Sequence, residues 1–256
     1  MLGALIGDIV GSRWEFYPTN DYNFEWLSLE NGFTDDTICT IAVADALLHG
    51  RDFGESIHDW CRRYPNPKGG YGGRFAQWVH SDDPQPYNSF GNGSAMRVSP
   101  VAHWYDNVDE VFDAAAATAL PSHNHDEGIK GAQTVALAIF RALQHGEQAP
   151  EYIDNILDEC VQFSGYDINI KKADVINRFD ETCQGTVPVA LWIIGISDSF
   201  EDAVRKAVSL GADADTLGAI VGSIAEAIWG IPIEMKQQIL PYLTDEIKEV
   251  VNQFNE

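Results

Sequence analysis

Apolar residues recur at helical spacing along most of this chain, whereas the alternating pattern typical of β-strands is scarce. Within residues 126–144 the apolar side chains share one helical stripe, made by Ile129, Ala132, Val135, Ala136, Ile139 and Leu143. Similar helical patterns cover residues 36–48, 52–63, 71–80, 108–118, 151–163, 186–196, 200–209, 214–229, 233–240 and 243–254. The pattern therefore predicts an all-α fold.

The segments between these helices are rich in Gly, Pro, Asn, Asp and Ser, which predicts loops at 13–33, 64–70, 81–94 and 119–125. The segment 64–73 is too short to separate two domains. With 45% hydrophobic and 11% aromatic residues, the chain can bury a substantial core. We expect residues 1–256 to form one compact multi-helix domain.

The chain carries 39 acidic and 16 basic residues, which gives a formal net charge of −23. Such a surface repels nucleic-acid backbones and anionic membranes, so nucleic acid is not expected as a partner except as a modified substrate. Solubility or adaptation to salt is the simplest explanation of the charge. The four cysteines are widely spaced without a CxxC pair and are expected to be reduced, mostly buried thiols: Cys39, Cys61, Cys160 and Cys183.

The first seven residues are apolar, but no basic region precedes them and Asp8 interrupts the run. This pattern is too short for a signal peptide or a membrane span, and no later stretch reaches spanning length without a charge. We therefore expect a cytoplasmic protein that does not enter the membrane.

Two acidic clusters stand where long apolar helices are predicted to begin: Thr34-Asp35-Asp36-Thr37 and Asp213-Ala214-Asp215-Thr216. Helix capping explains one such side chain per helix. These clusters supply two carboxylates each, and four converging carboxylates repel one another unless cations neutralise them. Because all the candidate ligands are hard oxygens, the clusters predict two Mg²⁺, Mn²⁺ or Ca²⁺ ions rather than Zn²⁺. Two such ions can share and activate a water molecule.

Three other segments are candidates for substrate contacts. In Gly91-Asn92-Gly93-Ser94-Ala95-Met96-Arg97, two glycines suit a turn that presents amides to an anion, although an ordinary turn fits as well. Glu15 lies beside Trp14 and Phe16, so it is either an acid or base with a raised pKa or a surface residue. Tyr71 lies among four glycines, in either a flexible lid or a plain loop.

His123 and His125 are two residues apart beside Asp126, a spacing that suggests zinc but lacks a third strong ligand. The alternative is an Asn or Asp that caps the helix starting near Glu127. The segment Cys183-Gln184-Gly185 is expected to be a loop, and without a paired His its thiol is not expected to be a nucleophile.

Taken together, these segments resemble the ADP-ribosylglycohydrolase family. The segments that carry the resemblance are Gly3 to Gly11 with Glu15, Phe33 to Thr37, Gly91 to Pro100, Ser122-His123, and Gly211 to Thr216 with Gly218 and Gly222. The resemblance implies an all-α fold with a cleft that holds two Mg²⁺ or Mn²⁺ ions. It also implies cleavage of the N- or O-glycosidic bond between C1″ of ADP-ribose and an acceptor.

The resemblance also implies roles for individual residues. The implied metal ligands are Thr34, Asp35, Asp36, Asp213, Asp215 and Thr216. The implied substrate contacts are Gly91, Asn92, Gly93, Ser94 and His123, to which we add Met96 and Tyr71 as candidates. Asp35, Asp36, Asp215 and Glu15 are the candidate catalytic residues, where Glu15 matches a mobile glutamate near the metals in some members.

Two other functions fit the same residues. One is a regulatory module that binds ADP-ribose with metal support but does not turn it over. The other is a metal-dependent phosphohydrolase that uses the same carboxylates. Arginine-directed members of the family commonly have Thr-His where this chain has Ser122-His123, so the acceptor stays open between arginine, serine, a nucleobase and a small molecule. The choice between Mg²⁺ and Mn²⁺ and the oligomeric state also stay open.

Overall fold

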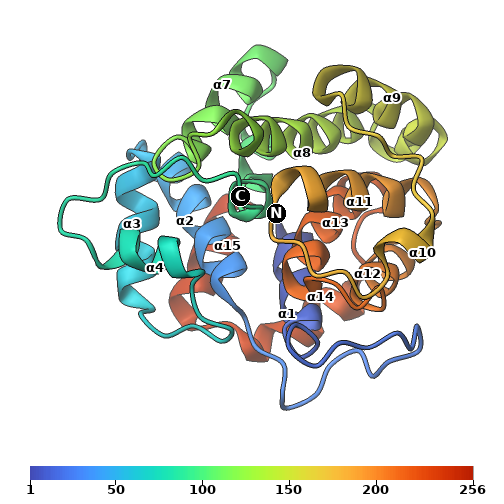
Figure 1. Ribbon diagram of the computed structural model, residues 1–256, viewed down its shortest axis with the longest axis horizontal. Helices are drawn as coiled ribbons and strands as arrows, with labels where there is room; N and C mark the ends of the chain where they lie inside the picture. Colours follow the sequence, from blue (N-terminus) through green and yellow to red (C-terminus); the bar gives the residue numbers. More distant parts are fainter. Residues whose placement is uncertain (256) are drawn as a thin grey trace.

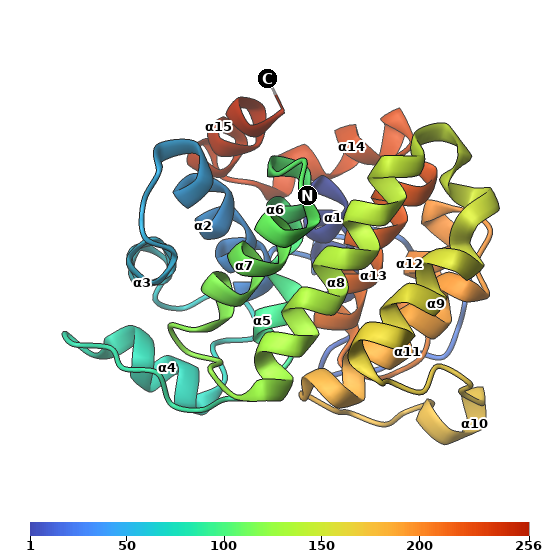
Figure 2. The same ribbon diagram turned by 90° about the horizontal axis from the view of Figure 1, so that it is seen from above.

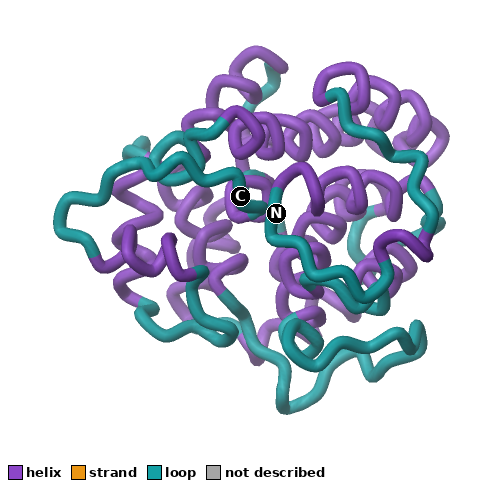
Figure 3. Tube along the Cα trace, viewed as in Figure 1, coloured by secondary structure: helices purple, strands orange, loops and turns teal. Residues whose placement is uncertain are grey.

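The computed structural model describes residues 1–255, and within them it contains only helices and loops, apart from one isolated bridge between Gly91 and Thr182 (Figures 1 and 3). The elements are α1 (Leu2–Gly11), α2 (Asp35–His49), α3 (Phe53–Arg63), α4 (Gly73–His80), α5 (Gly93–Met96), α6 (Ser99–Trp104), α7 (Val108–Ala119), α8 (Asp126–His145), η1 (Gly146–Tyr152), α9 (Ile153–Ser164), α10 (Lys172–Val175), α11 (Cys183–Gly195), α12 (Phe200–Val208), α13 (Ala214–Trp229), α14 (Ile233–Ile239), η2 (Leu240–Tyr242) and α15 (Asp245–Phe254). The prediction of an all-α fold is confirmed.

Helices α1 and α13 pack at the centre, with α1 between α2 and α13 in both ribbon views (Figures 1 and 2). Their contact runs along glycines spaced four residues apart, Gly3, Gly7 and Gly11 on α1 and Gly218 and Gly222 on α13. A Cβ on Gly3 would lie 2.2 Å from the carbonyl oxygen of Gly222, and one on Gly11 would lie 2.2 Å from that of Ala214. Glycine is required here because the two backbones touch directly.

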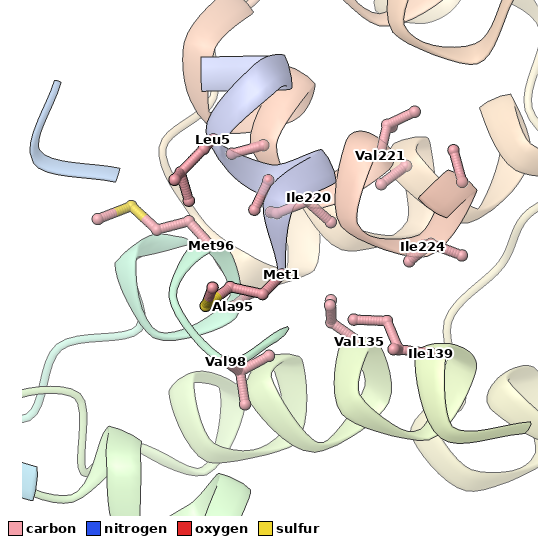
Figure 4. Packing of buried hydrophobic residues seen from close by; sticks show 14 of the residues in the cluster. Met1, Leu5, Ala95, Met96, Val98, Val135, Ile139, Ile220, Val221 and Ile224 are labelled. Atoms are coloured by element: carbon pink, nitrogen blue, oxygen red, sulfur yellow. The ribbon is translucent and has the colours of Figure 1, made fainter. Parts of the chain in front are cut away.

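Side chains from several helices meet around this central pair. Figure 4 shows Leu5 of α1 and Ile220 of α13 near Met96 of α5, while Val135 and Ile139 approach from α8. Helix α8 crosses α13, with α7 and α9 packed against it (Figure 2). All of these apolar side chains are buried, and each stabilises the fold by about 1.5–3 kcal/mol relative to exposure. One continuous core therefore supports the first turns of α2 and α13.

Most predicted helices differ from the observed ones by two residues or fewer at each end. Helix α11 is the exception, because it begins at Cys183 and not at residue 186. The prediction of a loop at 183–185 was wrong. Gly185 and Pro188 are typical of loops, but the Thr182 side chain accepts a hydrogen bond from Gly185 N and caps the helix before them.

The sequence analysis did not identify α1, α5, α6 or α10 as helices. In α1 nine of ten residues are buried, so its sequence has no polar face to reveal a helical period. No helix among residues 1–255 combines the length and the apolar character that a membrane span requires. All four cysteines are free and buried, as expected.

Candidate metal and substrate site

The first acidic cluster forms the beginning of α2, as its sequence predicted. Thr34 is the N-cap, and its Oγ1 accepts a hydrogen bond from the backbone N of Asp36 at 3.2 Å. The same hydroxyl donates to Asp8 Oδ1 on α1 at 2.8 Å. Capping therefore uses Thr34, so neither Asp35 nor Asp36 is needed as the cap. Asp35 is half-buried and Asp36 is buried.

The second cluster begins α13 and meets the first cluster directly. Thr216 Oγ1 donates to Asp36 Oδ2 at 3.3 Å, which joins residues 180 positions apart. Asp213, at the N-cap position, has no capping bond from its side chain, and its Oδ2 accepts a hydrogen bond from Asn92 Nδ2 at 2.8 Å. Asp215 follows in the first turn and is buried. The convergence of the two clusters, which spacing could not establish, is thus present.

Carboxylate oxygens cluster where the first turns of α2 and α13 meet, which we call the acidic junction, and they have too few hydrogen-bond donors around them. One oxygen each of Asp8, Asp36 and Asp215 lies within 4.8 Å of the others, and all three residues are buried. In the described part of the chain, Oδ1 of Asp36 and Oδ1 of Asp215 have no hydrogen-bond partner. Buried acceptors that lack donors cost free energy unless a cation approaches them. This group of oxygens therefore fits a metal ion.

Burial and the crowding of the carboxyls also raise their pKa values. Burial, and then the nearby Asp215 and Asp8, hold the pKa of Asp36 well above its ordinary value. Burial raises the pKa of Asp213 to about 6, although the hydrogen bond from Asn92 opposes the shift. A bound cation favours the ionised form and reverses this direction.

Asp8 is a member of the site that the sequence analysis missed. It is fully buried on α1 and accepts hydrogen bonds from the backbone N and the hydroxyl of both Thr34 and Thr37. Burial raises its pKa to about 6 despite these four bonds. A lone carboxylate within an apolar helix, between Gly7 and Gly11, was the available signal.

A pocket of about 450 Å³ opens over the acidic junction, within the size range of ligand sites. Of the predicted residues, those that line it are Glu15, Asp35, Asp36, Tyr71, Gly91, Asn92, Gly93, Met96, His123, Asp213, Asp215 and Thr216. Phe16, Tyr87 and Phe179, which the sequence analysis did not assign to the site, add aromatic surface. The pocket thus combines carboxylates, glycine backbone and aromatic rings.

The glycine loop, Gly91 to Ser94, is held in place by hydrogen bonds with residues at the start of α11. Asn92 N donates to the carbonyl oxygen of Glu181, and Cys183 N donates to that of Phe90. The Ser94 side chain faces inward and donates to Gly128 O at 2.7 Å, so the structure does not bring this hydroxyl to the pocket. Burial raises the pKa of Cys183 to about 12, which agrees with the expectation that its thiol is not a nucleophile.

The Tyr71 segment is better anchored than a free lid. The Tyr71 hydroxyl donates to the carbonyl oxygens of Tyr64 at 2.8 Å and Cys61 at 3.1 Å. Across the pocket, Glu15 is half-buried. Its Oε2 lies close to Gly69, because a Cβ built on Gly69 would be 2.6 Å from this oxygen. Burial, followed by the negative charge of Asp215, raises the pKa of Glu15 to about 8. Burial and the nearby carboxylates therefore favour the protonated form of Glu15 while no cation is bound.

The two histidines after α7 have different surroundings. His123 is buried in the pocket wall, between the rings of Phe75 and Tyr87. His125 is the N-cap of α8, and its Nδ1 accepts a hydrogen bond from Glu127 N at 3.0 Å. The cap is thus a histidine rather than the expected Asn or Asp. Among the described residues, neither histidine belongs to a group that could hold a metal, which removes the zinc alternative.

Comparison with known proteins shows which family this chain belongs to. The family profile described as ADP-ribosylglycohydrolase matches residues 1–256. Mouse ADP-ribosylhydrolase ARH3 is 25% identical over 306 residues, covering 90% of this chain and 83% of that protein. The ADP-ribosylarginine hydrolase Tri1 of Pseudomonas putida is 25% identical, covering 90% of this chain and 70% of that protein.

A solved structure shares the whole fold. It is a chain of an ADP-ribosylglycohydrolase-related protein complex, with a TM-score of 0.74 and 25% sequence identity. The match covers 99% of this chain and 94% of the other. Sequence profile, relatives and fold agree, and this chain belongs to the ADP-ribosylglycohydrolase family of hydrolases.

Proposed function

We propose that the protein hydrolyses the glycosidic bond between ADP-ribose and an acceptor, with two divalent cations, Mg²⁺ or Mn²⁺, in the acidic junction. The observation that carries this proposal is the hydrogen bond from Thr216 to Asp36, which joins two carboxylate clusters under one pocket. The proposed ligands are Thr34, Asp35, Asp36, Asp213, Asp215 and Thr216. Bound cations would polarise a water molecule and the ribose hydroxyl oxygens.

Two pocket carboxyls suit the proton transfers of glycoside hydrolysis. Asp36 or a neighbouring carboxylate of the two clusters accepts the proton of the attacking water. Glu15, whose raised pKa favours the protonated form, donates a proton to the acceptor atom as the bond from C1″ breaks and its electron pair leaves with the acceptor. The surrounding carboxylates stabilise positive charge that develops on the ribose.

The opposite wall supplies contacts for the rest of ADP-ribose. Gly91, Asn92 and Gly93 present backbone close to the pocket, where a phosphate or ribose can approach without a side chain in the way. The aromatic rings of Tyr71, Phe16 and Phe179 offer flat apolar surface for a base. A panel of substrates with different acceptors is needed to identify the acceptor group.

Purified protein should be incubated with ADP-ribosylarginine and ADP-ribosylserine peptides, with Mg²⁺, with Mn²⁺ and with EDTA. We expect free ADP-ribose, detected by mass spectrometry, only when a cation is present. Asp215→Asn should lose the activity, whereas Asp106→Asn, an exposed carboxylate between α6 and α7, should keep it.

The same assay separates the alternatives. Tight ADP-ribose binding by calorimetry without product from any substrate would contradict hydrolysis and support a binding module. Release of phosphate or nucleotide with the glycosidic bond intact would support a phosphohydrolase instead.

A further inference from the structure

A series of hydrogen bonds leads from Arg97 through Ser122 to His123 in the pocket wall. Arg97 Nη2 donates to Ser122 Oγ at 3.0 Å and to the carbonyl oxygen of Thr118 at 2.7 Å. Ser122 Oγ lies 2.8 Å from His123 Nδ1. Arg97 and Ser122 are fully buried, so bulk solvent does not reach these hydrogen bonds.

The donors and acceptors of these hydrogen bonds can be assigned in one consistent way. An arginine only donates, so Ser122 Oγ accepts from Arg97. The remaining partner of the serine hydroxyl proton is His123 Nδ1, because Ser122 Oγ has no other hydrogen-bond partner within residues 1–255. If Nδ1 carried a proton instead, the serine proton would be buried without an acceptor, at a cost of about 1–3 kcal/mol. Nδ1 therefore accepts.

The other ring nitrogen faces the glycine loop. A Cβ built on Gly93 would lie 3.0 Å from His123 Nε2, and one on Gly91 would lie 3.4 Å away. Nε2 makes no hydrogen bond with any of the described residues, and a neutral ring with Nδ1 unprotonated carries its proton on Nε2. The ring thus presents one N–H to the pocket, where it has no partner from the protein.

We propose that Ser122 and Arg97 are positioning residues that lock His123 as a neutral Nε2–H donor, directed at an oxygen of the bound ligand. This inference rests on the proposed function for the identity of that ligand, the diphosphate or ribose of ADP-ribose. In this arrangement His123 binds an oxygen throughout the reaction and transfers no proton. The acid and base steps stay with the carboxyls.

The charges around the ring support the neutral form. Within residues 1–255 Arg97 forms no ion pair and its Nε and Nη1 have no hydrogen-bond partner, so no carboxylate in direct contact offsets its positive charge beside the ring. Burial and then this charge hold the pKa of His123 well below its ordinary value. The other groups packed on the ring are Tyr87, whose pKa burial raises, and the uncharged Phe75. No negative charge among these groups favours the imidazolium.

The tautomer can be read from long-range ¹H–¹⁵N spectra of the ligand-free wild-type protein, because protonated and unprotonated ring nitrogens have different shifts. The chain has seven histidines, and the spectrum of His123→Gln identifies the signal of His123. We expect a protonated Nε2 and an unprotonated Nδ1, unchanged between about pH 5.5 and 8.5. A protonated Nδ1, or a titration near the ordinary histidine pKa, would overturn the proposal.

Three variants test the relay itself. Ser122→Thr keeps the hydroxyl, so His123 should keep a protonated Nε2 and an unprotonated Nδ1. Ser122→Ala should show mixed tautomers of His123 and weaken ADP-ribose binding, measured by calorimetry, about 2- to 10-fold. Thr118→Val is the matched control, because it removes a buried hydroxyl yet leaves the carbonyl that Arg97 uses. An unchanged tautomer in folded Ser122→Ala would contradict the relay. The spectra need no substrate, so this result is independent of whether ADP-ribose is the ligand.

Discussion

Gly7 of α1 and Gly218 of α13 are in backbone contact, and a Cβ on Gly7 would lie 1.9 Å from the carbonyl oxygen of Gly218. Asp8 directly follows Gly7, and Thr216 lies two residues before Gly218. The contact therefore sets how closely the carboxylate of α1 approaches the acidic turn of α13. The separation of the carboxylates of Asp8 and Asp215 is controlled by residues that carry no functional group.

Gly7→Ala should destabilise the protein by about 1–3 kcal/mol, because α1 and α13 must move apart to admit the methyl group. The same shift should weaken metal binding, since Asp8 and Asp215 separate. Chemical denaturation and calorimetry with Mn²⁺ measure the two effects. Gly32→Ala is the control, since its Cβ would meet only Lys68 Cδ at 3.5 Å. Equal stability of the two variants would show that the backbone contact is unimportant.

Removal of divalent cations should make stability fall as pH rises. The pKa values of Asp8 and Asp213 are raised to about 6, so these carboxyls bind protons more tightly in the folded chain than in the unfolded one. Their contribution is complete below about pH 4 and is lost as pH rises through about 6. Asp36 and Asp215, with pKa values well above their ordinary value, extend the loss to higher pH.

Thermal denaturation in EDTA and in Mn²⁺ checks this prediction. Because cations compete with protons for the carboxylates, the increase in Tm caused by Mn²⁺ should be larger at about pH 8 than at about pH 5. In Asp36→Asn the increase should be reduced at both pH values. An equal increase at both pH values in the wild-type protein would contradict a carboxylate metal site.

Glu15→Gln should lower kcat by about 100-fold or more, because the amide cannot donate the proton that the leaving group requires. The Tm increase caused by Mn²⁺ should persist, since Glu15 is not among the proposed ligands. Glu25→Gln, in the same loop, alters an exposed carboxylate paired with Arg13 and should leave kcat unchanged. If Glu15→Gln instead abolished the Mn²⁺ effect with kcat nearly intact, Glu15 would be a ligand and not an acid.

Asp8→Asn should weaken Mn²⁺ binding about 10- to 100-fold, because Asp8 orients Thr34 and the first turn of α2 through four hydrogen bonds. The amide replaces an acceptor oxygen with a donor opposite Thr34 or Thr37. Thr37→Val removes one hydroxyl that donates to Asp8 at 2.5 Å and should show a smaller loss. Calorimetry of Mn²⁺ binding measures both. A larger effect of Thr37→Val would indicate that packing, rather than the Asp8 carboxylate, controls the turn.

Local sequence patterns were sufficient for most of the longer helices and for the positions of both acidic clusters. The apolar stripe of 126–144 became α8, and Thr34 and Asp213 stand at the N-caps of α2 and α13. These features depend on neighbours within a few residues, namely the helical period and the free amides of a first turn. They can be predicted because every interaction that specifies them is local.

The other features of the site depend on contacts between residues that are distant in the sequence. The inward orientation of Ser94, the anchored hydroxyl of Tyr71 and the role of Asp8 each depend on a partner at least seven positions away. No periodicity in the sequence encodes which helices touch, and the close approach of α1 and α13 follows only when Gly7 meets Gly218. The sequence by itself therefore determined most of the longer helices and the two clusters of carboxylates. Tertiary packing alone decided that the clusters meet, because the contacts that bring them together, Gly7 with Gly218 and Thr216 with Asp36, join residues far apart in the chain.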